Sequence, residues 1–557
     1  MPPRRLRSSG LLAAATLVAA GLVVAASIQT VWWSPLNVDE ELTLRLSDFS
    51  FRHIFHIVST QRGGGPLHFW LEHFLQGWWP GLESLRLPSL VFACLALPAV
   101  ALVARELIGD EGASAVVLLV AVSPIPVLYA TFGRPHTLLF AWLMWGTVAA
   151  LRAARSGSRG WWIVAGASLG LSVLVHPTAP LYALTAFAAA AVYAPRAPRR
   201  VVREAWPGAV ALLVTFLPYY VRTLHVLGDR YGVGSGPSGG RTFTGRPVWN
   251  DAVHFVAPGS GVVNSFTALA AVGVVALAWR RRGRVLAFCA VTVAAPVLFF
   301  SLVPASGDSA LFFDRYMIPA TPAFLAIVVA GCLALGSWAG PLRLVVAGLL
   351  IAVLLGVELR DAHRRLDNQR GIGLDAVTHA VAQVPRDSVL FGSTGTSGAS
   401  FSSFDYGHPA NILDHYLALR LRRLQLVDDD SCARALPFVQ GPVKPRFGVW
   451  VFYAAAPAET QPAAVAFGRL PGILVARAGR GYFVVRSRGR LQPRELIALG
   501  RRVRLAWKGA VPLNRRVDEL LQADRLLLAA PPVCVPYGDL GDPDISPHWP
   551  PVKTSHQ

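Results

Sequence analysis

Long apolar runs recur through the first two thirds of the chain and limit the folds that it can adopt. They fall at about 11–33, 86–104, 113–130, 136–151, 161–176, 177–194, 207–224, 262–279, 285–303, 317–335 and 343–358. A helix that crosses a bilayer needs roughly 17–25 mostly apolar residues. The chain is therefore predicted to be a polytopic α-helical membrane protein with about 11 transmembrane helices. Only 15% of its residues are charged, which excludes an ordinary soluble enzyme and a disordered chain.

Two of these stretches allow a second interpretation. The first begins with Arg4, Arg5 and Arg7 and could be a cleaved signal peptide with a site near Ala26, but its apolar run continues to Trp33, which favours a retained helix. Residues 161–194 could form one long helix. The His176-Pro177 pair in their middle favours a hairpin of two helices instead.

The net charge of +20 is typical of nucleic-acid-binding proteins, so its distribution along the chain matters. With the N-terminus inside, the inner segments carry sixteen arginines and four acidic residues. The outer loops up to Arg360 carry ten arginines and eleven acidic residues. An excess of arginine marks the cytoplasmic side, so these charges indicate topology and no nucleic acid is expected as a partner. The strong preference for arginine over lysine suggests a high-GC bacterial genome, and hence a bacterial plasma membrane.

Residues 360–557 differ in composition from the preceding chain, because their apolar runs are shorter and their charge is higher. With eleven spans this region lies outside the membrane, so we expect a transmembrane domain at 1–359 and an extracytoplasmic α/β domain at 360–557. Strands are predicted at 388–392, 447–453, 473–477 and 482–486, and helices at 374–384, 411–427, 493–507 and 515–529. A Pro-rich end follows at 531–551.

Charged residues lie at the membrane boundary in three outer loops. The loop at 34–85 opens with Asp39 and Glu40, and its stretch 66–79 is aromatic and amphipathic. In the other two loops, Arg134 and Arg315 each precede a span on the same face of the membrane. Two guanidinium groups could neutralise a lipid phosphate, while a carboxylate could accept a proton from a hydroxyl nucleophile. Taken singly, each residue is better explained as a boundary charge or a helix cap.

The order of these motifs resembles that in GT-C membrane glycosyltransferases. The shared features are Asp39-Glu40, Gly65-Pro66-Leu67, Arg86-Leu87-Pro88-Ser89, Arg134-Pro135, and Arg315-Tyr316 with Pro319, over roughly residues 1–358. Within that superfamily the chain looks most like family 39, which includes protein O-mannosyltransferases, the aminoarabinose transferase of lipid A and bacterial relatives.

The resemblance implies a polyprenyl-phosphate sugar as donor and a hydroxyl-bearing acceptor, with transfer at the outer face. Asp39 matches the family's catalytic aspartate, and Glu40 matches its second acid, which would orient the acceptor. Arg134 and Arg315 would bind the donor phosphate as it leaves. The family also often has a histidine at the position of His176. Together with His68, His136 and Tyr316, which lie in or beside the same outer loops, His176 is a further candidate for a substrate contact.

Two departures from the family pattern concern the acceptor and a metal. Relatives often have His-Pro-Pro-Leu-Tyr where this chain has Gly64-Gly65-Pro66-Leu67-His68, and many have an acid at the position of Phe132. His68 and His73 are five residues apart, which does not match a zinc-binding helix. No metal site and no cofactor are predicted, although a divalent metal stays open.

Three features of the 360–557 region have alternative explanations. Asp405, His408, Asp414 and His415 could bind a metal but fit a solvated turn better, and Gly392–Gly398 follows a strand and could cradle a phosphate or form a loop. Cys432 and Cys534 are the two cysteines of this region and are predicted to form a disulfide.

Two other classes of function stay open. A transporter or lipid flippase would carry charges in the middle of its spans, where this chain has few. A non-catalytic envelope scaffold would tolerate the loss of Asp39.

Overall fold

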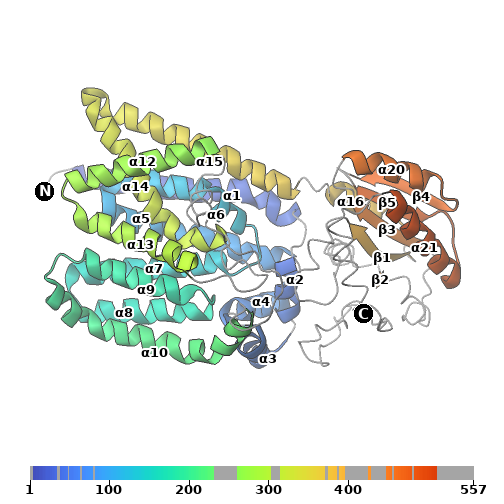
Figure 1. Ribbon diagram of the computed structural model, residues 1–557, viewed down its shortest axis with the longest axis horizontal. Helices are drawn as coiled ribbons and strands as arrows, with labels where there is room; N and C mark the ends of the chain where they lie inside the picture. The colour runs from blue at the N-terminus through green and yellow to red at the C-terminus, as the bar shows by residue number, and fades with distance from the viewer. Residues whose placement is uncertain are drawn as a thin grey trace. The chain divides into compact units, whose positions relative to one another are not determined.

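The protein is described by a computed structural model (Figure 1). The structure describes residues 4–33, 38–47, 49–62, 65–79, 82–230, 260–302, 314–370, 374–385, 388–395, 425–427, 447–453, 457–478 and 482–510. These residues form two compact units. One contains Met1–Trp32 and Leu46–Asp367, and the other contains Trp33–Arg45 and Asn368–Gln557.

The first unit is helical, and the eleven predicted apolar stretches fall within the following helices, with 86–104 and most of 113–130 sharing one helix. These are α1 (Arg4–Trp33), α5 (Leu82–Val122), α6 (Pro124–Tyr129), α7 (His136–Ser156), α8 (Arg159–Leu171), α9 (Ala179–Tyr193), α10 (Pro198–Arg230), α12 (Ser260–Trp279), α13 (Gly283–Leu302), α14 (Thr321–Trp338) and α15 (Arg343–Arg370). Six helices in the described part of the chain are long and apolar enough to cross a membrane, and three shorter helices are also apolar. The chain is therefore a multi-pass membrane protein, while the count of eleven spans stays a prediction.

Two chain reversals divide long apolar segments as the sequence predicts. In α5, Gly109 has a φ of 83° and interrupts the helix between the predicted spans 86–104 and 113–130. Between α8 and α9, the short 3₁₀ helix η2 (Ser172–Leu174) and a turn through His176 separate two helices. The hairpin interpretation of 161–194 is therefore confirmed.

Glycines allow two helix pairs to approach at backbone distance. A Cβ atom on Gly166 of α8 would overlap the carbonyl oxygen of Gly208 in α10, and one on Gly273 of α12 would overlap that of Ile327 in α14. Helices in a membrane associate chiefly through such close packing, because lipid tails are as apolar as the side chains. These contacts hold α8 against α10 and α12 against α14.

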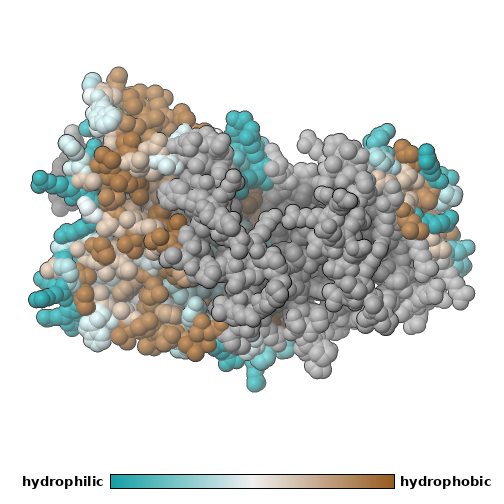
Figure 2. Space-filling view, in the orientation of Figure 1, coloured by the Kyte–Doolittle hydropathy of each residue, from teal (hydrophilic) through white to brown (hydrophobic). Residues whose placement is uncertain are grey.

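Arginines gather at one end of the helical unit, where α7 meets α8 and α12 meets α13; Figure 2 shows hydrophilic residues at this end and hydrophobic ones along the flanks. Arg155 pairs with Glu106 of α5 at 2.7 Å, and Arg196 donates to the carbonyl oxygen of Ala154 at the end of α7. This end carries the arginine excess that the charge count assigns to the cytoplasm.

The predicted loop 34–85 contains helices of its own. They are α2 (Val38–Ser47), α3 (Phe51–Ile57), the π-helical turn η1 (Val58–Arg62) and α4 (Pro66–Trp78). Proline at the first position of α4 suits a helix start, since its missing N–H would have no helical partner there. The amphipathic stretch 66–79 is thus helical, as expected.

The second unit contains a five-stranded sheet in the order β2-β1-β3-β5-β4, made of β1 (Ser388–Gly395), β2 (Gln425–Val427), β3 (Phe447–Tyr453), β4 (Ile473–Ala478) and β5 (Tyr482–Ser487). β1 runs parallel to β2 and β3, whereas β5 runs antiparallel to β3 and β4. Helices α20 (Pro457–Gly468) and α21 (Pro493–Ala510) contribute Phe467 and Leu499 to a core with Trp450, and α16 (Leu374–Ala382) also lies in this unit.

The four predicted strands and the helices at 374–384 and 493–507 correspond to these elements. The helix predicted over 411–427 is wrong for its last three residues, which form β2, and α20 was not predicted. The helix at 515–529 and the Pro-rich end lie outside the described residues.

Candidate active site

Three segments that are far apart in the sequence meet at the end of the helical unit opposite the arginine-rich end. They are the turn before α7, the turn before α9, and the 3₁₀ helix η3 (Asp314–Ala320). The ring centroid of His136 lies 5.2 Å from that of His176, and Tyr316 lies 6.5 Å and 5.7 Å from these two rings. We call His136, His176 and Tyr316 the ring cluster. It joins the chain segments that carry Arg134 and Arg315.

Hydrogen bonds fix two members of the ring cluster. The hydroxyl of Tyr182 in α9 donates to the carbonyl oxygen of Tyr316, which ties η3 to α9. The Nδ1 atom of His176 accepts from the backbone N–H of Thr178 at 3.2 Å. This acceptor role assigns the ring proton of neutral His176 to Nε2.

His68 of α4 lies beside the turn that precedes α7. Its Nε2 donates to the carbonyl oxygen of Gly133 at 3.2 Å, and its side chain is only 3% exposed. Burial and the nearby positive charge of Arg134 lower the pKa of His68 to about 3, against the opposing effect of the hydrogen bond to Gly133. The ring is therefore neutral at physiological pH.

The sequence did not single out Glu72, which is fully buried on the same helix as His68. Its Oε1 lies 3.9 Å from Nδ1 of His68. Its position four residues after His68 places both side chains on one face of α4, and this spacing could have revealed the pair. His73, five residues after His68, binds the carbonyl oxygen of Ser47 at 2.6 Å instead.

Of the four predicted acids and arginines, only Arg134 and Glu40 have side chains that the structure describes. Arg134 is half-buried in the turn before α7. Arg315 lies in η3 and Asp39 in α2, and the side chains of both are outside the description. Glu40, also in α2, is 1% exposed. The roles of these four residues stay predictions.

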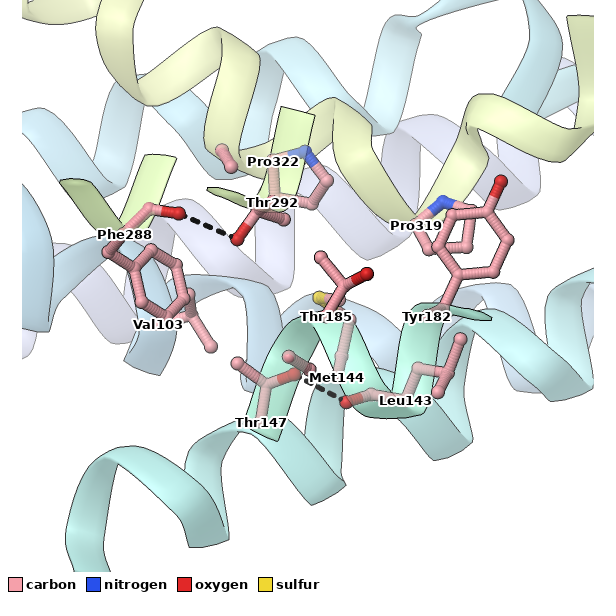
Figure 3. Close-up of a pocket in the computed structure, with 12 residues that line it drawn as sticks. Val103, Leu143, Met144, Thr147, Tyr182, Thr185, Phe288, Thr292, Pro319 and Pro322 are labelled. Atoms are coloured by element: carbon pink, nitrogen blue, oxygen red, sulfur yellow. Dashed lines mark hydrogen bonds between the residues drawn. The ribbon is translucent and has the colours of Figure 1, made fainter. Parts of the chain in front are cut away.

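A small pocket lies between α7, α9, α13, α14 and η3 (Figure 3). Its lining includes Tyr182 and Thr185 of α9, Thr147 of α7, Thr292 of α13 and Pro322 of α14. Figure 3 shows the hydroxyls of Thr147 and Thr292 turned back to carbonyl oxygens of their own helices, at 2.7 and 2.9 Å. Thr185 does the same at 2.6 Å. With these hydroxyls satisfied, the pocket presents mainly apolar surface.

The predicted metal and disulfide residues lie outside the part of the chain that the structure describes. Among the described residues, no group of three or more His, Cys, Asp or Glu side chains could hold a metal ion. Asp405, His408, Asp414 and His415 lie outside the described residues, as do Cys432 and Cys534. Gly392–Gly395 forms the end of β1, and the remainder of the Gly-rich stretch lies outside the description.

Comparison with known proteins identifies the fold. Residues 65–221 match a family model described as dolichyl-phosphate-mannose-protein mannosyltransferase. The crystal structure of apo ArnT from Cupriavidus metallidurans has a TM-score of 0.52 and 16% identity, covering 86% of this chain and 98% of that chain. This chain has the fold of the GT-C membrane glycosyltransferases. The predicted fold resemblance is thus confirmed.

Other solved GT-C structures are also similar. ArnT from the same organism bound to undecaprenyl phosphate has a TM-score of 0.51 and 15% identity, covering 86% of this chain and 98% of that chain. The apo oligosaccharyltransferase of Archaeoglobus fulgidus has a TM-score of 0.44 and 14% identity, over 83% and 73% of the two chains. No curated protein sequence matches this chain. The family match of 65–221 includes His68, Arg134 and His176, but neither Asp39 nor Arg315.

Proposed function

We propose that the chain is an inverting glycosyltransferase that moves a sugar from a polyprenyl-phosphate donor to a hydroxyl acceptor at the outer face of the membrane. The main supporting observation is the ring cluster, because it brings the segments of Arg134 and Arg315 together at one end of a GT-C fold. Two findings agree with this donor class. The matching family model is named for a dolichyl-phosphate sugar, and a structure of similar fold binds undecaprenyl phosphate.

In this mechanism Asp39 accepts the proton of the acceptor hydroxyl. The acceptor oxygen forms a bond to the anomeric carbon while the bond from that carbon to the phosphate oxygen breaks. The polyprenyl phosphate leaves with the electron pair of that bond, and Arg134 and Arg315 stabilise its charge. Glu40 orients the acceptor. One displacement inverts the anomeric centre.

The apolar pocket lining beside η3 marks the part of the helical unit along which we expect the first isoprene units of the donor to lie, although the pocket itself is too small to enclose them. Its wall includes Tyr182, which binds the carbonyl oxygen of Tyr316, so the pocket begins next to η3 and the Arg315 backbone. Apolar chains gain free energy by leaving water for such a surface. A donor with its phosphate near the arginines would place its chain among the helices.

Side-specific labelling tests the proposed orientation. We expect a cysteine at Ser260 to react with an impermeant reagent in intact cells and one at Arg282 to react only after permeabilisation. This outcome would place the ring cluster and the 360–557 region outside. Labelling in intact cells of the cysteine at position 282, but not of the cysteine at position 260, would contradict the eleven-span topology.

The Asp39→Asn variant tests the function. In nanodiscs with a polyprenyl-phosphate sugar donor, we expect this variant to insert and bind donor, while its turnover per folded molecule falls by roughly 10²–10⁴-fold, because asparagine cannot accept the proton. Asp110→Asn is the matched control, since Asp110 pairs with Arg105 away from the site. A variant that keeps more than about a tenth of wild-type turnover would contradict Asp39 as the base, and Glu40 or Glu41 would become the next candidate.

The same assay separates the alternative classes of function. A scaffold would show no transfer in the wild-type protein. A transporter or flippase would move labelled lipid between leaflets without forming a glycosylated product. Either outcome in the wild-type protein would reject the proposed function.

A further inference from the structure

Side chains from two helices hold the backbone of Arg134. On one side, Nε2 of His68 in α4 donates to the carbonyl oxygen of Gly133 at 3.2 Å. On the other, the hydroxyl of Ser89 in α5 donates to the carbonyl oxygen of Arg134 itself at 3.3 Å. These two hydrogen bonds bind consecutive carbonyl groups, one before and one after the Cα atom that carries the guanidinium side chain.

Close packing leaves this turn little room to move. A Cβ atom on Gly133 would overlap the side chain of Leu85 in α5, so the turn lies directly against that helix. The first turn of α4 is held in the same way, because a Cβ atom on Gly65 would overlap the backbone of Leu174 and Val175. The helix that carries His68 is therefore anchored to the chain segment that leads to His176.

The environment of His68 suits a hydrogen-bond donor better than a substrate contact. The ring is almost completely buried and makes its Nε2 contact with protein backbone. Its pKa of about 3 keeps it neutral beside the positive charge of Arg134, so it donates from Nε2 without repelling the guanidinium. The buried Glu72 lies on the Nδ1 side of the ring, 3.9 Å away.

We propose that His68 and Ser89 are positioning residues, which hold the Arg134 backbone so that its guanidinium can bind the donor phosphate. This assignment rests on the proposed function, because it takes Arg134 to be a phosphate ligand. It replaces the earlier expectation that His68 contacts substrate. A preorganised ligand binds and stabilises charge better than a mobile one, since no ordering has to occur during binding.

The first test measures binding of polyprenyl phosphate alone to the full-length protein in nanodiscs. We expect His68→Phe and Ser89→Ala each to raise its Kd by about tenfold, the size of effect expected for one lost hydrogen bond that leaves a buried carbonyl unsatisfied. His68→Gln should restore most of the affinity, because its amide N–H can reach the same carbonyl. His73→Phe, on the same helix but bound to Ser47, is the matched control and should bind normally.

A double-mutant cycle shows whether the effect passes through Arg134. In an Arg134→Ala background, His68→Phe should cause no further loss of affinity. Independent losses in the two variants, or normal binding by His68→Phe, would overturn the proposal. In steady-state kinetics, we expect His68→Phe to raise the donor KM rather than to lower kcat. His68→Gln should bring the KM back towards that of the wild type.

A chemical readout separates this inference from the proposed function. Phenylglyoxal modifies exposed guanidinium groups, and mass spectrometry can follow its reaction at Arg134. We expect faster modification of Arg134 in His68→Phe and Ser89→Ala than in the wild-type protein or His73→Phe, whether or not the protein transfers sugar. Equal rates in all variants would reject the positioning role. Failure of the wild-type protein to bind polyprenyl phosphate, with the rate differences intact, would instead reject the proposed donor.

Discussion

The imidazole rings of His136 and His176 lie 5.2 Å apart, although His136 begins α7, His176 lies in the turn before α9, and the whole of α7 and α8 separates them in the sequence. Tyr316 lies within 6.5 Å of both rings and brings a third segment to the same place. His136 is two residues after Arg134, and Tyr316 directly follows Arg315. The ring cluster therefore places two arginine-bearing turns, identified separately in the sequence, at one end of the helical unit.

The first prediction concerns the chemistry of the two arginines. Lysine keeps the positive charge but lacks the planar fork that binds two phosphate oxygens together. We expect Arg134→Lys and Arg315→Lys to retain part of the affinity for polyprenyl phosphate, and both alanine variants to lose more. The measurement is Kd for the lipid phosphate in nanodiscs.

Arg159→Lys and Arg159→Ala are matched controls, because Arg159 starts α8 at the opposite end of the helical unit. These variants should bind the lipid phosphate normally. Unchanged binding by both Arg134→Ala and Arg315→Ala would show that these residues are only boundary charges.

A second prediction concerns the hydrogen bond from Tyr182 to the carbonyl oxygen of Tyr316. Tyr182→Phe keeps the ring in the pocket wall but leaves this carbonyl group without that donor. We expect donor Kd to rise by roughly fivefold to tenfold, because η3 carries Arg315 and loses an anchor to α9. Tyr129→Phe is a suitable control, since its ring also lies 4.8 Å from His136 but belongs to α6. A normal Kd for Tyr182→Phe would show that this hydrogen bond does not contribute to donor binding.

The helical unit was largely predictable from the sequence, because an apolar run of sufficient length has few alternatives in a membrane. The His176-Pro177 pair also marked a chain reversal correctly, since it disfavours a continuous helix, whereas Gly109, which interrupts α5, was not singled out in the sequence. The small strand β2 was missed because its three residues follow a stretch with helical periodicity. Pairing with β1 determines its structure, and such pairing is not visible in local sequence.

The site could be predicted only in part. Sequence order identified Arg134 and Tyr316, yet no local pattern indicates that His136 and Tyr316 are neighbours. The sequence also did not indicate that His68 is buried, because a lone histidine near a binding loop resembles a substrate contact. Its burial and its bond to Gly133 depend on how α4 packs against the turn before α7.

A third prediction concerns the contact between α8 and α10. Gly166→Leu places a side chain where the carbonyl oxygen of Gly208 lies, so the helices must separate. Overpacking of this kind costs roughly 1–3 kcal/mol, which should lower the thermal unfolding midpoint of the purified protein. Gly348→Ala in α15 is the control, since its added Cβ atom meets nothing within 4 Å. Equal midpoints for Gly166→Leu and the wild type would contradict this close packing.

The fourth prediction is the disulfide between Cys432 and Cys534, which would link the Pro-rich end to the α/β domain. An outer location permits oxidation, and closing a ~100-residue loop could stabilise this domain by up to ~4–5 kcal/mol in the chain-entropy model. Mass spectrometry of unreduced protein should find the two cysteine peptides joined. The membrane-embedded Cys289 and Cys332 are free in the structure and serve as internal controls. Alkylation of both Cys432 and Cys534 without reductant would refute the bond.

The last prediction follows from the pKa of His68, which is about 3 in the folded protein against 6.5 for an ordinary histidine. Between these values the unfolded chain binds a proton that the folded protein does not, so the free energy of unfolding falls as pH decreases below 6.5. At pH 5 this single residue should cost about 2 kcal/mol of stability relative to pH 7.5.

His68→Gln keeps a donor for Gly133 but cannot titrate, so its unfolding midpoint should fall less than that of the wild type over this range. His73→Gln should follow the wild type. The ionisable groups facing His68 are Arg134 and Glu72, and both are present in all three proteins. Parallel pH curves for the wild type and His68→Gln would mean that the folded protein protonates His68 as readily as the unfolded chain does, and the lowered pKa of His68 would be wrong.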